Sequence, residues 1–308
     1  MTHGLNRRGF LKRTGAGAAA LLASSQLGQW ASAEGEKTRK ILFFTRSAGY
    51  QHSAITRKKP DELSFAETWT TDFGKQHNFE VTCTKDGGVF TEEGLAPYDV
   101  IMFYTTGVLD GPADSKDPIN HKPMPPGGKE LFLKSIAAGK GFVGVHSSTD
   151  TFHRPKGDNS VDPYIAMIGG EFLMHNAQEP CRLVAVEENW GPIKGLKTFT
   201  QIKEEWYRLK NIAPDMQVLL WQDTSTMKQP VYNTFAPYPE TWARKHGKGR
   251  VFYTSMGHNE TVWKTPEFSQ VLLGGLQWTS GNVEADVKPN AKEVTPKALF
   301  RDPDVTAG

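Results

Sequence analysis

Short apolar runs alternate with amphipathic segments through the first half of this 308-residue chain, and this alternation limits the fold more than any other feature. Strands covered on both faces are apolar along their whole length, whereas surface helices repeat apolar residues every three or four positions. Phe65, Trp69 and Phe73 follow the helical spacing, and Gly74 is expected to end that helix. A second helix is expected around residues 131–136. The expected strands are residues 40–45, 79–82, 98–104 and 141–145.

The second half is less regular but carries the same kinds of element. Thr265 and Pro266 form a helix start, with an N-cap followed by an N1 proline. Strands that alternate with helices predict an α/β fold with a doubly wound, mostly parallel sheet. No repeat or linker divides residues 39–280, which are expected to form one domain, and residues 281–308 are expected to be a loosely held tail. The strands expected here are residues 181–186, 217–221 and 249–255.

Residues 1–33 have the features of a cleavable export signal. A twin-arginine pair, Arg7-Arg8, precedes an apolar, alanine-rich stretch, and Ala-Ser-Ala at 31–33 supplies a cleavage site. The alternative, a basic amphipathic helix of the domain, leaves both motifs as coincidences. Export by the twin-arginine route to the periplasm or another extracytoplasmic compartment is therefore expected.

The charge balance argues against nucleic acid as a partner, and the lengths of the apolar stretches argue against a membrane. Loss of the signal removes four basic and no acidic residues, which takes the formal net charge from +2 to −2. A near-neutral chain without clusters of Lys and Arg is not suited to nucleic acid. No stretch has the roughly 20 apolar residues needed to cross a bilayer. The expected partner is a small molecule, rather than nucleic acid or a membrane.

Histidines recur at the ends of the predicted strands. His52 lies in the loop after the first strand, His146 directly follows the fourth, and His258 follows the last. Ligands of open α/β sheets bind beyond the carboxyl ends of the strands, so these imidazoles and the nearby His175 are expected to share a pocket. Imidazole transfers protons near neutral pH or ligates a metal. The other histidines, expected to face solvent, are His3, His77, His121, His153 and His246.

Acidic and aromatic residues near these positions are further candidates. Glu-Glu-Trp-Tyr at 204–207 places Glu205 beside two rings suited to stack on a sugar, although a surface strand with ordinary alternation gives the same pattern. Asp150 is expected either to orient the imidazole four residues before it or to cap the next helix. Glu260 lies two residues after a strand-end histidine, where it is either a partner for that imidazole or a solvated side chain.

Together these segments resemble the ThuA-like (trehalose-utilisation) family, whose fold is similar to that of flavodoxin-like proteins and class I glutamine amidotransferases. The likeness spans residues 39–280 and implies one ThuA-like domain. It also implies a role in carbohydrate catabolism, with a sugar or an oxidised, keto sugar as the substrate. The matching stretches are residues 47–52, 141–150, 169–175, 204–207 and 239–258.

The comparison with amidotransferases also shows a difference. That fold carries a cysteine nucleophile in a Gly-x-Cys-x-Gly turn, but here the turn reads Gly-Val-His-Ser-Ser, with His146 in place of the thiol. His258 and Glu260 match the His-x-Glu pair of the fold. Neither Cys83 nor Cys181 lies at the turn, which excludes glutamine hydrolysis through a thioester. The sequence leaves open whether these two cysteines form a disulfide.

These residues favour an enzyme that moves protons on a sugar or keto-sugar, with isomerisation or elimination beside a carbonyl as the fitting reactions. A divalent metal such as zinc would assist this chemistry. The expected catalytic residues are His146, His258 and Glu205. The residues expected to bind substrate are His52, Asp150, Trp206 and Tyr207. The candidate metal ligands are His52, His146, His175 and His258.

The sequence leaves two other functions open. A serine hydrolase would use Ser147 or Ser148 as nucleophile, although the usual Gly-x-Ser-x-Gly turn is absent from the sequence. Its histidine and acid would be His258 and Glu260. A non-catalytic carbohydrate-binding protein would instead stack sugars on exposed aromatic rings, and fold alone does not reject it. The candidate rings are Trp206, Tyr207 and Trp263.

Overall fold

The computed structural model describes Met1 and residues 37–302, apart from residues 113–120, 156, 187, 189 and 236. Residues from Lys37 onward belong to one unit. The export signal expected at residues 1–33 lies, except for Met1, outside the described residues. None of the helices in the described part of the chain has the length and apolar character of a membrane span.

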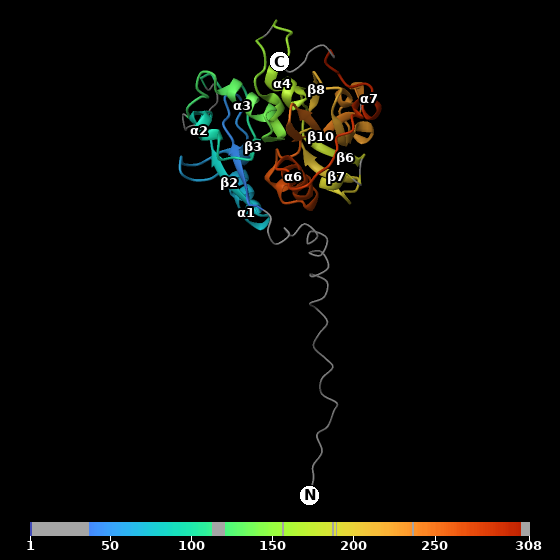
Figure 1. The fold of residues 1–308 in the computed structure, drawn as a ribbon. Helices are drawn as coiled ribbons and strands as arrows, with labels where there is room; N and C mark the ends of the chain where they lie inside the picture. Colours follow the sequence, from blue (N-terminus) through green and yellow to red (C-terminus); the bar gives the residue numbers. More distant parts are fainter. Residues whose placement is uncertain are drawn as a thin grey trace. The chain divides into compact units, whose positions relative to one another are not determined.

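A nine-stranded sheet forms the centre of this unit, in the order β2-β1-β3-β4-β11-β10-β9-β6-β7 (Figure 1). The first five strands in this order are parallel, and the remaining pairings are antiparallel. The predicted α/β fold is confirmed. The strands of this sheet are β1 Arg39–Phe44, β2 Phe79–Thr84, β3 Val100–Phe103, β4 Gly141–Val145, β6 Glu179–Ala185, β7 Phe199–Glu204, β9 Gln217–Asp223, β10 Tyr238–His246 and β11 Gly249–Thr254.

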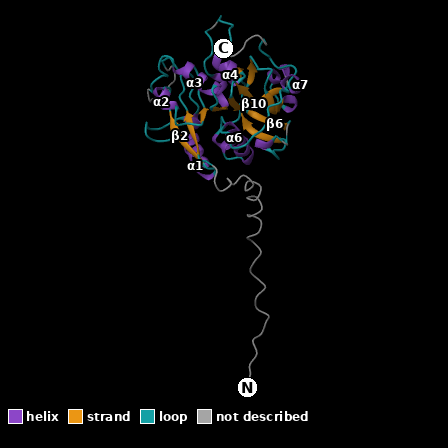
Figure 2. Cartoon of the chain, viewed as in Figure 1, coloured by secondary structure: helices purple, strands orange, loops and turns teal. Residues whose placement is uncertain are grey.

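Helices cover both faces of the sheet (Figure 2). Phe252 of β11 packs under α6, where a Cβ on Gly275 would lie 2.5 Å from the phenylalanine ring, so glycine allows this close approach. The next residue, Tyr253, belongs to the core cluster on the side of α4, because consecutive strand residues point to opposite faces. The helices are α1 Phe65–Gln76, α2 Glu92–Leu95, α3 Gly128–Ala137, α4 Pro163–Ile168, α5 Glu260–Trp263, α6 Pro266–Thr279 and α7 Ala291–Val294.

The first helix begins at a capping box and ends later than predicted. The Ser64 hydroxyl accepts a hydrogen bond from Glu67 N, and the Glu67 carboxylate accepts one from Ser64 N. The expected end at Gly74 is wrong, because α1 continues to Gln76. Gly74 instead allows close packing on β2, where a Cβ would lie 2.6 Å from a valine methyl. The predicted N-cap of α6, Thr265, is confirmed, since its hydroxyl accepts a hydrogen bond from Phe268 N.

Several elements between β4 and β11 were not predicted from the sequence. The strands β5 Glu171–Met174 and β8 Arg208–Lys210 pair with each other in a separate two-stranded sheet. β7 and β10 extend the main sheet beyond its parallel half. The two cysteines, Cys83 and Cys181, are both free, so they form no disulfide with each other.

The C-terminal residues pack against the domain, so the expectation of a loosely held tail is wrong for residues 281–302. The Asn290 side chain accepts a hydrogen bond from Val218 N at 2.7 Å and donates one to Val218 O at 3.1 Å. Phe300 forms a bridge with Ile212. Arg301 is buried and donates a hydrogen bond to a carbonyl at the α4 helix. The tail therefore satisfies backbone groups along β9 that water would otherwise solvate.

Replacing Asn290 with alanine should destabilise the fold by about 1–3 kcal/mol, because it leaves the N–H and C=O of Val218 without their side-chain partner. Urea unfolding followed by circular dichroism measures this change. Lys292→Ala, at an exposed position of α7, is the control and should stay within about 0.5 kcal/mol of the wild type. Equal stability of the two variants would contradict the packed tail.

Candidate functional site

Three histidines from different strand ends meet at one edge of the sheet. His52 lies in the loop after β1, His146 directly follows β4, and His258 lies in the loop after β11. Their ring centroids are 4.8 Å apart for His52 and His146, 5.1 Å for His52 and His258, and 5.2 Å for His146 and His258. The expected meeting of these three imidazoles is therefore observed, while the roles assigned to them stay predictions.

The carboxylate of Glu205, which follows β7, lies among these imidazoles. Its Oε2 is 3.2 Å from His258 Nδ1, 3.5 Å from His146 Nε2 and 4.0 Å from His52 Nε2. One donor atom from each of the four residues lies within 4.8 Å of the other three. We call these four residues the His/Glu cluster. Its members are buried apart from His258, which is partly exposed.

The backbone at His146 explains how its imidazole enters the cluster. His146 adopts a left-handed conformation with φ of +47°, which is uncommon for a residue other than glycine. Its Nδ1 lies 2.7 Å from Ser255 O and must donate, because a carbonyl only accepts. Nε2 therefore presents its lone pair to the cluster, where it accepts from the Tyr207 hydroxyl at 2.8 Å. Burial lowers the pKa of His146 to about 3, so the ring is neutral near pH 7.

Glu204 is a site residue that sequence reasoning passed over. It is fully buried, and its carboxylate accepts hydrogen bonds from Glu205 N and Gly257 N at 2.8 Å and from His258 N at 3.2 Å. Burial raises its pKa to about 8, even though these three donors favour the ionised form. Glu204 thus joins β7 to the loop that carries His258. The adjacent pair of acids was the available signal, but it did not show that both side chains are buried.

Glu240 of β10 holds the start of the same loop. This fully buried carboxylate accepts hydrogen bonds from the Thr254 and Ser255 hydroxyls and from Met256 N at 2.9–3.0 Å. Two buried acids therefore bind the backbone N–H groups of three consecutive residues, 256–258. Sequence reasoning also missed Glu240, which lies in a strand that was not predicted.

His175 lies at the rim of the cluster. Its side chain is 39% exposed, and its Nδ1 lies 3.3 Å from Oε1 of Glu205. It therefore contacts the carboxylate oxygen that faces away from the other three histidines. His175 is not among the four residues whose donor atoms converge. The structure brings together three of the four predicted metal ligands and adds Glu205 to them.

Comparison with known proteins supports the fold and the family. A family model named ThuA and described as trehalose utilisation matches residues 40–279. The chain belongs to the ThuA family. Similar solved structures include ThuA-like proteins from Bacteroides uniformis, 19% identical with a TM-score of 0.58, and Parabacteroides merdae, 15% identical with a TM-score of 0.59. The first match covers 81% of this chain and 94% of that one, and the second covers 86% and 98%.

A search of curated proteins found no match. Membership of the ThuA family supports a carbohydrate-related role for the chain. The two structural matches are at low sequence identity and show the fold alone.

The aromatic rings expected to stack on a sugar are buried in this ThuA-family protein. Trp206 is fully buried, and its indole N–H donates to Glu179 O. Trp263 is fully buried as well, and its indole N–H donates to Gly257 O. The expectation that these two rings offer a stacking surface is wrong, because neither has an exposed face. Tyr207 is also buried. Its hydroxyl donates a hydrogen bond to His146, and its ring offers no exposed face to a sugar.

Asp150 and His153 pair with each other rather than with the cluster. His153 Nε2 lies 2.5 Å from Asp150 Oδ1, and its Nδ1 lies 2.7 Å from Glu171 Oε1. Asp150 therefore neither orients His146 nor caps a helix, and both expectations are wrong. His153 is not simply solvent-facing as predicted. His77 and His246 are also half-buried.

The geometry does not assemble the serine hydrolase triad. Ser147 Oγ lies 3.5 Å from His52 Nδ1, and the partner of His258 is Glu205. Glu260 is exposed in the first turn of α5. Ser148, the other candidate nucleophile, is fully buried.

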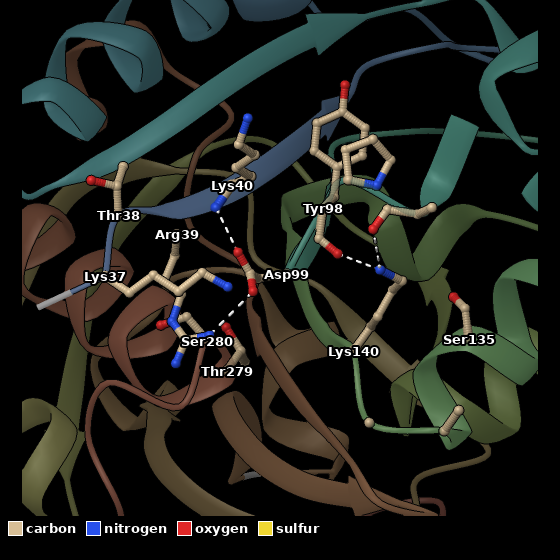
Figure 3. Close-up of a pocket in the computed structure, with 14 residues that line it drawn as sticks. Lys37, Thr38, Arg39, Lys40, Tyr98, Asp99, Ser135, Lys140, Thr279 and Ser280 are labelled. Carbon is tan, nitrogen blue, oxygen red and sulfur yellow. Dashed lines mark hydrogen bonds and ion pairs between the residues drawn. The ribbon is translucent and has the colours of Figure 1, made fainter. Parts of the chain in front are cut away.

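A cavity of about 700 Å³ lies at the opposite, amino-terminal ends of β1, β3 and β4 (Figure 3). Its charged lining residues other than Lys37 are paired within the protein. Arg39 contacts Asp99 at 3.1 Å, and the Lys140 ammonium donates to the carbonyl of Tyr98. Cations that already have protein partners offer little to an anionic ligand. The His/Glu cluster therefore stays the candidate site.

At pH 9, above the pKa of about 8 at which Glu204 ionises, Glu204→Gln should destabilise the protein by about 1–3 kcal/mol, because an amide offers one acceptor oxygen to three backbone donors and turns its own N–H groups toward them. Urea unfolding measures the change, with the exposed Glu62→Gln as the matched control. An unchanged unfolding midpoint in Glu204→Gln would show that Glu204 does not hold the His258 loop.

The ion pairs of His153 with Asp150 and Glu171 should stabilise the fold in a pH-dependent way. Burial lowers the pKa of His153, but its hydrogen bonds to Asp150 and Glu171 outweigh burial and raise it to about 9. A raised folded-state pKa gives stability that is complete below the ordinary value near 6.5 and is lost as the pH rises through about 9. His153→Gln should therefore lower the Tm more at pH 7 than at pH 10.

His246→Gln is the control for this measurement, since burial lowers the pKa of His246 and the residue is neutral at both pH values. Its effect on the Tm should be the same at pH 7 and pH 10. A pH-independent effect of His153→Gln would contradict the charged pair.

Proposed function

We propose that this ThuA-family protein is an exported enzyme that binds one divalent cation, with zinc as the first candidate, and performs acid–base chemistry on a sugar or keto-sugar. The observation that carries the proposal is the convergence of four donor atoms from His52, His146, Glu205 and His258 within 4.8 Å. The family supports a carbohydrate-related role. The twin-arginine motif at Arg7-Arg8 supports export.

The donor atoms suit zinc in type and spacing. Zinc takes imidazole nitrogen and carboxylate oxygen at about 2.0–2.2 Å, so neighbouring ligands of a tetrahedral site lie about 3.3 Å apart. The distance between His146 Nε2 and His258 Nδ1 is 3.3 Å, and Glu205 Oε2 lies 3.5 Å from the first of these atoms and 3.2 Å from the second. His52 Nε2 is further from Glu205 Oε2, at 4.0 Å. The hydrogen bond from His146 Nδ1 to Ser255 O is the usual support for a metal-ligating histidine.

The residues in and around the His/Glu cluster would have different roles in this chemistry. A bound divalent cation would polarise a carbonyl or hydroxyl oxygen of the sugar. His146 suits a ligand better than the general acid expected from the sequence, because its low pKa keeps the ring neutral. His175 suits proton exchange with the substrate, because it is partly exposed and contacts Glu205. Tyr207 donates its hydroxyl to the Nε2 lone pair of His146 in the absence of a metal, and a bound cation would take the place of this hydrogen bond on Nε2.

The tag-free protein, dialysed against zinc and then against buffer, should retain about one zinc per chain. His258→Gln should weaken zinc binding at least tenfold, because it removes a nitrogen donor from a partly exposed position. Plasma mass spectrometry of the dialysed proteins measures the metal. His246→Gln, a half-buried histidine outside the cluster, should retain the wild-type content.

Turnover then separates an enzyme from a binding protein. The zinc-loaded protein should convert trehalose or a mono-keto derivative of trehalose, and chelation should abolish the conversion. A protein that takes up no divalent metal, or that binds these sugars without converting them, would contradict the proposal.

A further inference from the structure

One exposed aromatic side chain lies beside the His/Glu cluster. Tyr50, in the loop between β1 and His52, is 68% exposed, and its ring centroid is 4.9 Å from that of His52. Tyr104 also packs on His52 but is fully buried. The aromatic rings suggested by the sequence, Trp206 and Trp263, are buried too. Tyr50 therefore offers an exposed ring beside the His/Glu cluster.

The backbone that carries Tyr50 is fixed. Its carbonyl accepts a hydrogen bond from the Thr106 hydroxyl at 2.6 Å, and Thr106 O accepts from Ala48 N at 2.8 Å and from Gly49 N at 3.3 Å. Gly107 lies so close to this loop that a Cβ there would be 2.5 Å from Gly49 N. Its φ of +75° also favours glycine. The ring is thus presented to solvent by an anchored loop.

We propose that Tyr50 forms a stacking wall for a pyranose ring whose oxygen-bearing edge reaches the His/Glu cluster. This inference rests on the proposed function, because it supplies the sugar-binding surface that the cluster lacks. One face of a pyranose is lined with C–H groups and packs on an aromatic ring, while its hydroxyls need polar partners. Tyrosine gives a large, rigid contact at a low cost in conformational entropy. The Tyr50 ring centroid lies 4.9 Å from that of His52, so a sugar stacked on Tyr50 lies next to a member of the His/Glu cluster.

The ring geometry also makes sugar stacking on Tyr50 independent of the arrangement of the His/Glu cluster. Tyr50 contacts His52 edge to face, with 84° between the ring planes, and it is still 68% exposed despite this contact. Stacking on Tyr50 therefore does not require the His52 imidazole to move. Removal of the ring should weaken sugar binding and leave the cluster itself intact.

The test compares Tyr50→Ala and Tyr50→Phe in the full protein. Calorimetric titration with trehalose and with its mono-keto derivative should show about tenfold weaker binding for Tyr50→Ala, while Tyr50→Phe stays near the wild type. If turnover is measured, KM should rise in Tyr50→Ala while kcat changes little. Zinc content and Tm should not change. Leu63→Ala, an exposed apolar residue outside the His/Glu cluster, should bind sugar like the wild type.

Each outcome has a distinct meaning. Sugar binding by Tyr50→Ala equal to that of the wild type overturns the stacking wall and leaves the proposed function standing. A wild-type protein that binds neither sugar overturns both. Weaker binding by Tyr50→Ala in a protein that takes up no metal supports the stacking wall and overturns the metal-assisted chemistry.

Discussion

The site depends on the capture of one loop by two buried carboxylates. Glu240 and Glu204 accept the backbone N–H groups of residues 256–258, and a buried N–H without a partner destabilises a fold by about 1–3 kcal/mol. The same loop supplies Ser255 O, which fixes the tautomer of His146, and it carries His258 itself. Two members of the His/Glu cluster are therefore positioned through the same pair of acids, although neither acid belongs to the cluster.

The left-handed turn at His146 is the second constraint. A non-glycine residue in this conformation costs on the order of 1–3 kcal/mol and persists only where neighbouring contacts hold it. The Tyr253 hydroxyl donates to His146 O at 2.7 Å, and Ser255 O holds the ring. The sharp turn directs the imidazole away from β4 toward Glu205. A strained residue at the end of a central strand, secured from two sides, is typical of a functional position.

The parallel strands and the meeting of His52, His146 and His258 could be predicted, because buried parallel strands are apolar throughout and their carboxyl ends share one edge. The burial of Trp206 could not, since it depends on how β6 and β7 pack on their neighbours, and these strands alternate only in part. The pairing of Asp150 with His153 depends on Glu171, which lies in a strand without a clear sequence signal. Asn290 holds β9 across more than seventy positions of sequence, a contact that composition alone does not reveal.

The protonation of the cluster supports the proposal of a bound cation. Glu205 Oε2 lies 3.5 Å from His146 Nε2, but His146 has committed its N–H to Ser255 O and has only a lone pair to offer the carboxylate. Protonation of Nε2 would resolve this contact, yet burial opposes a charged imidazole there. The Tyr207 hydroxyl satisfies Nε2 but leaves the carboxylate charge in place. A divalent cation accepts both the nitrogen and the oxygen lone pair without adding a proton, so it is the partner that this arrangement of donors favours.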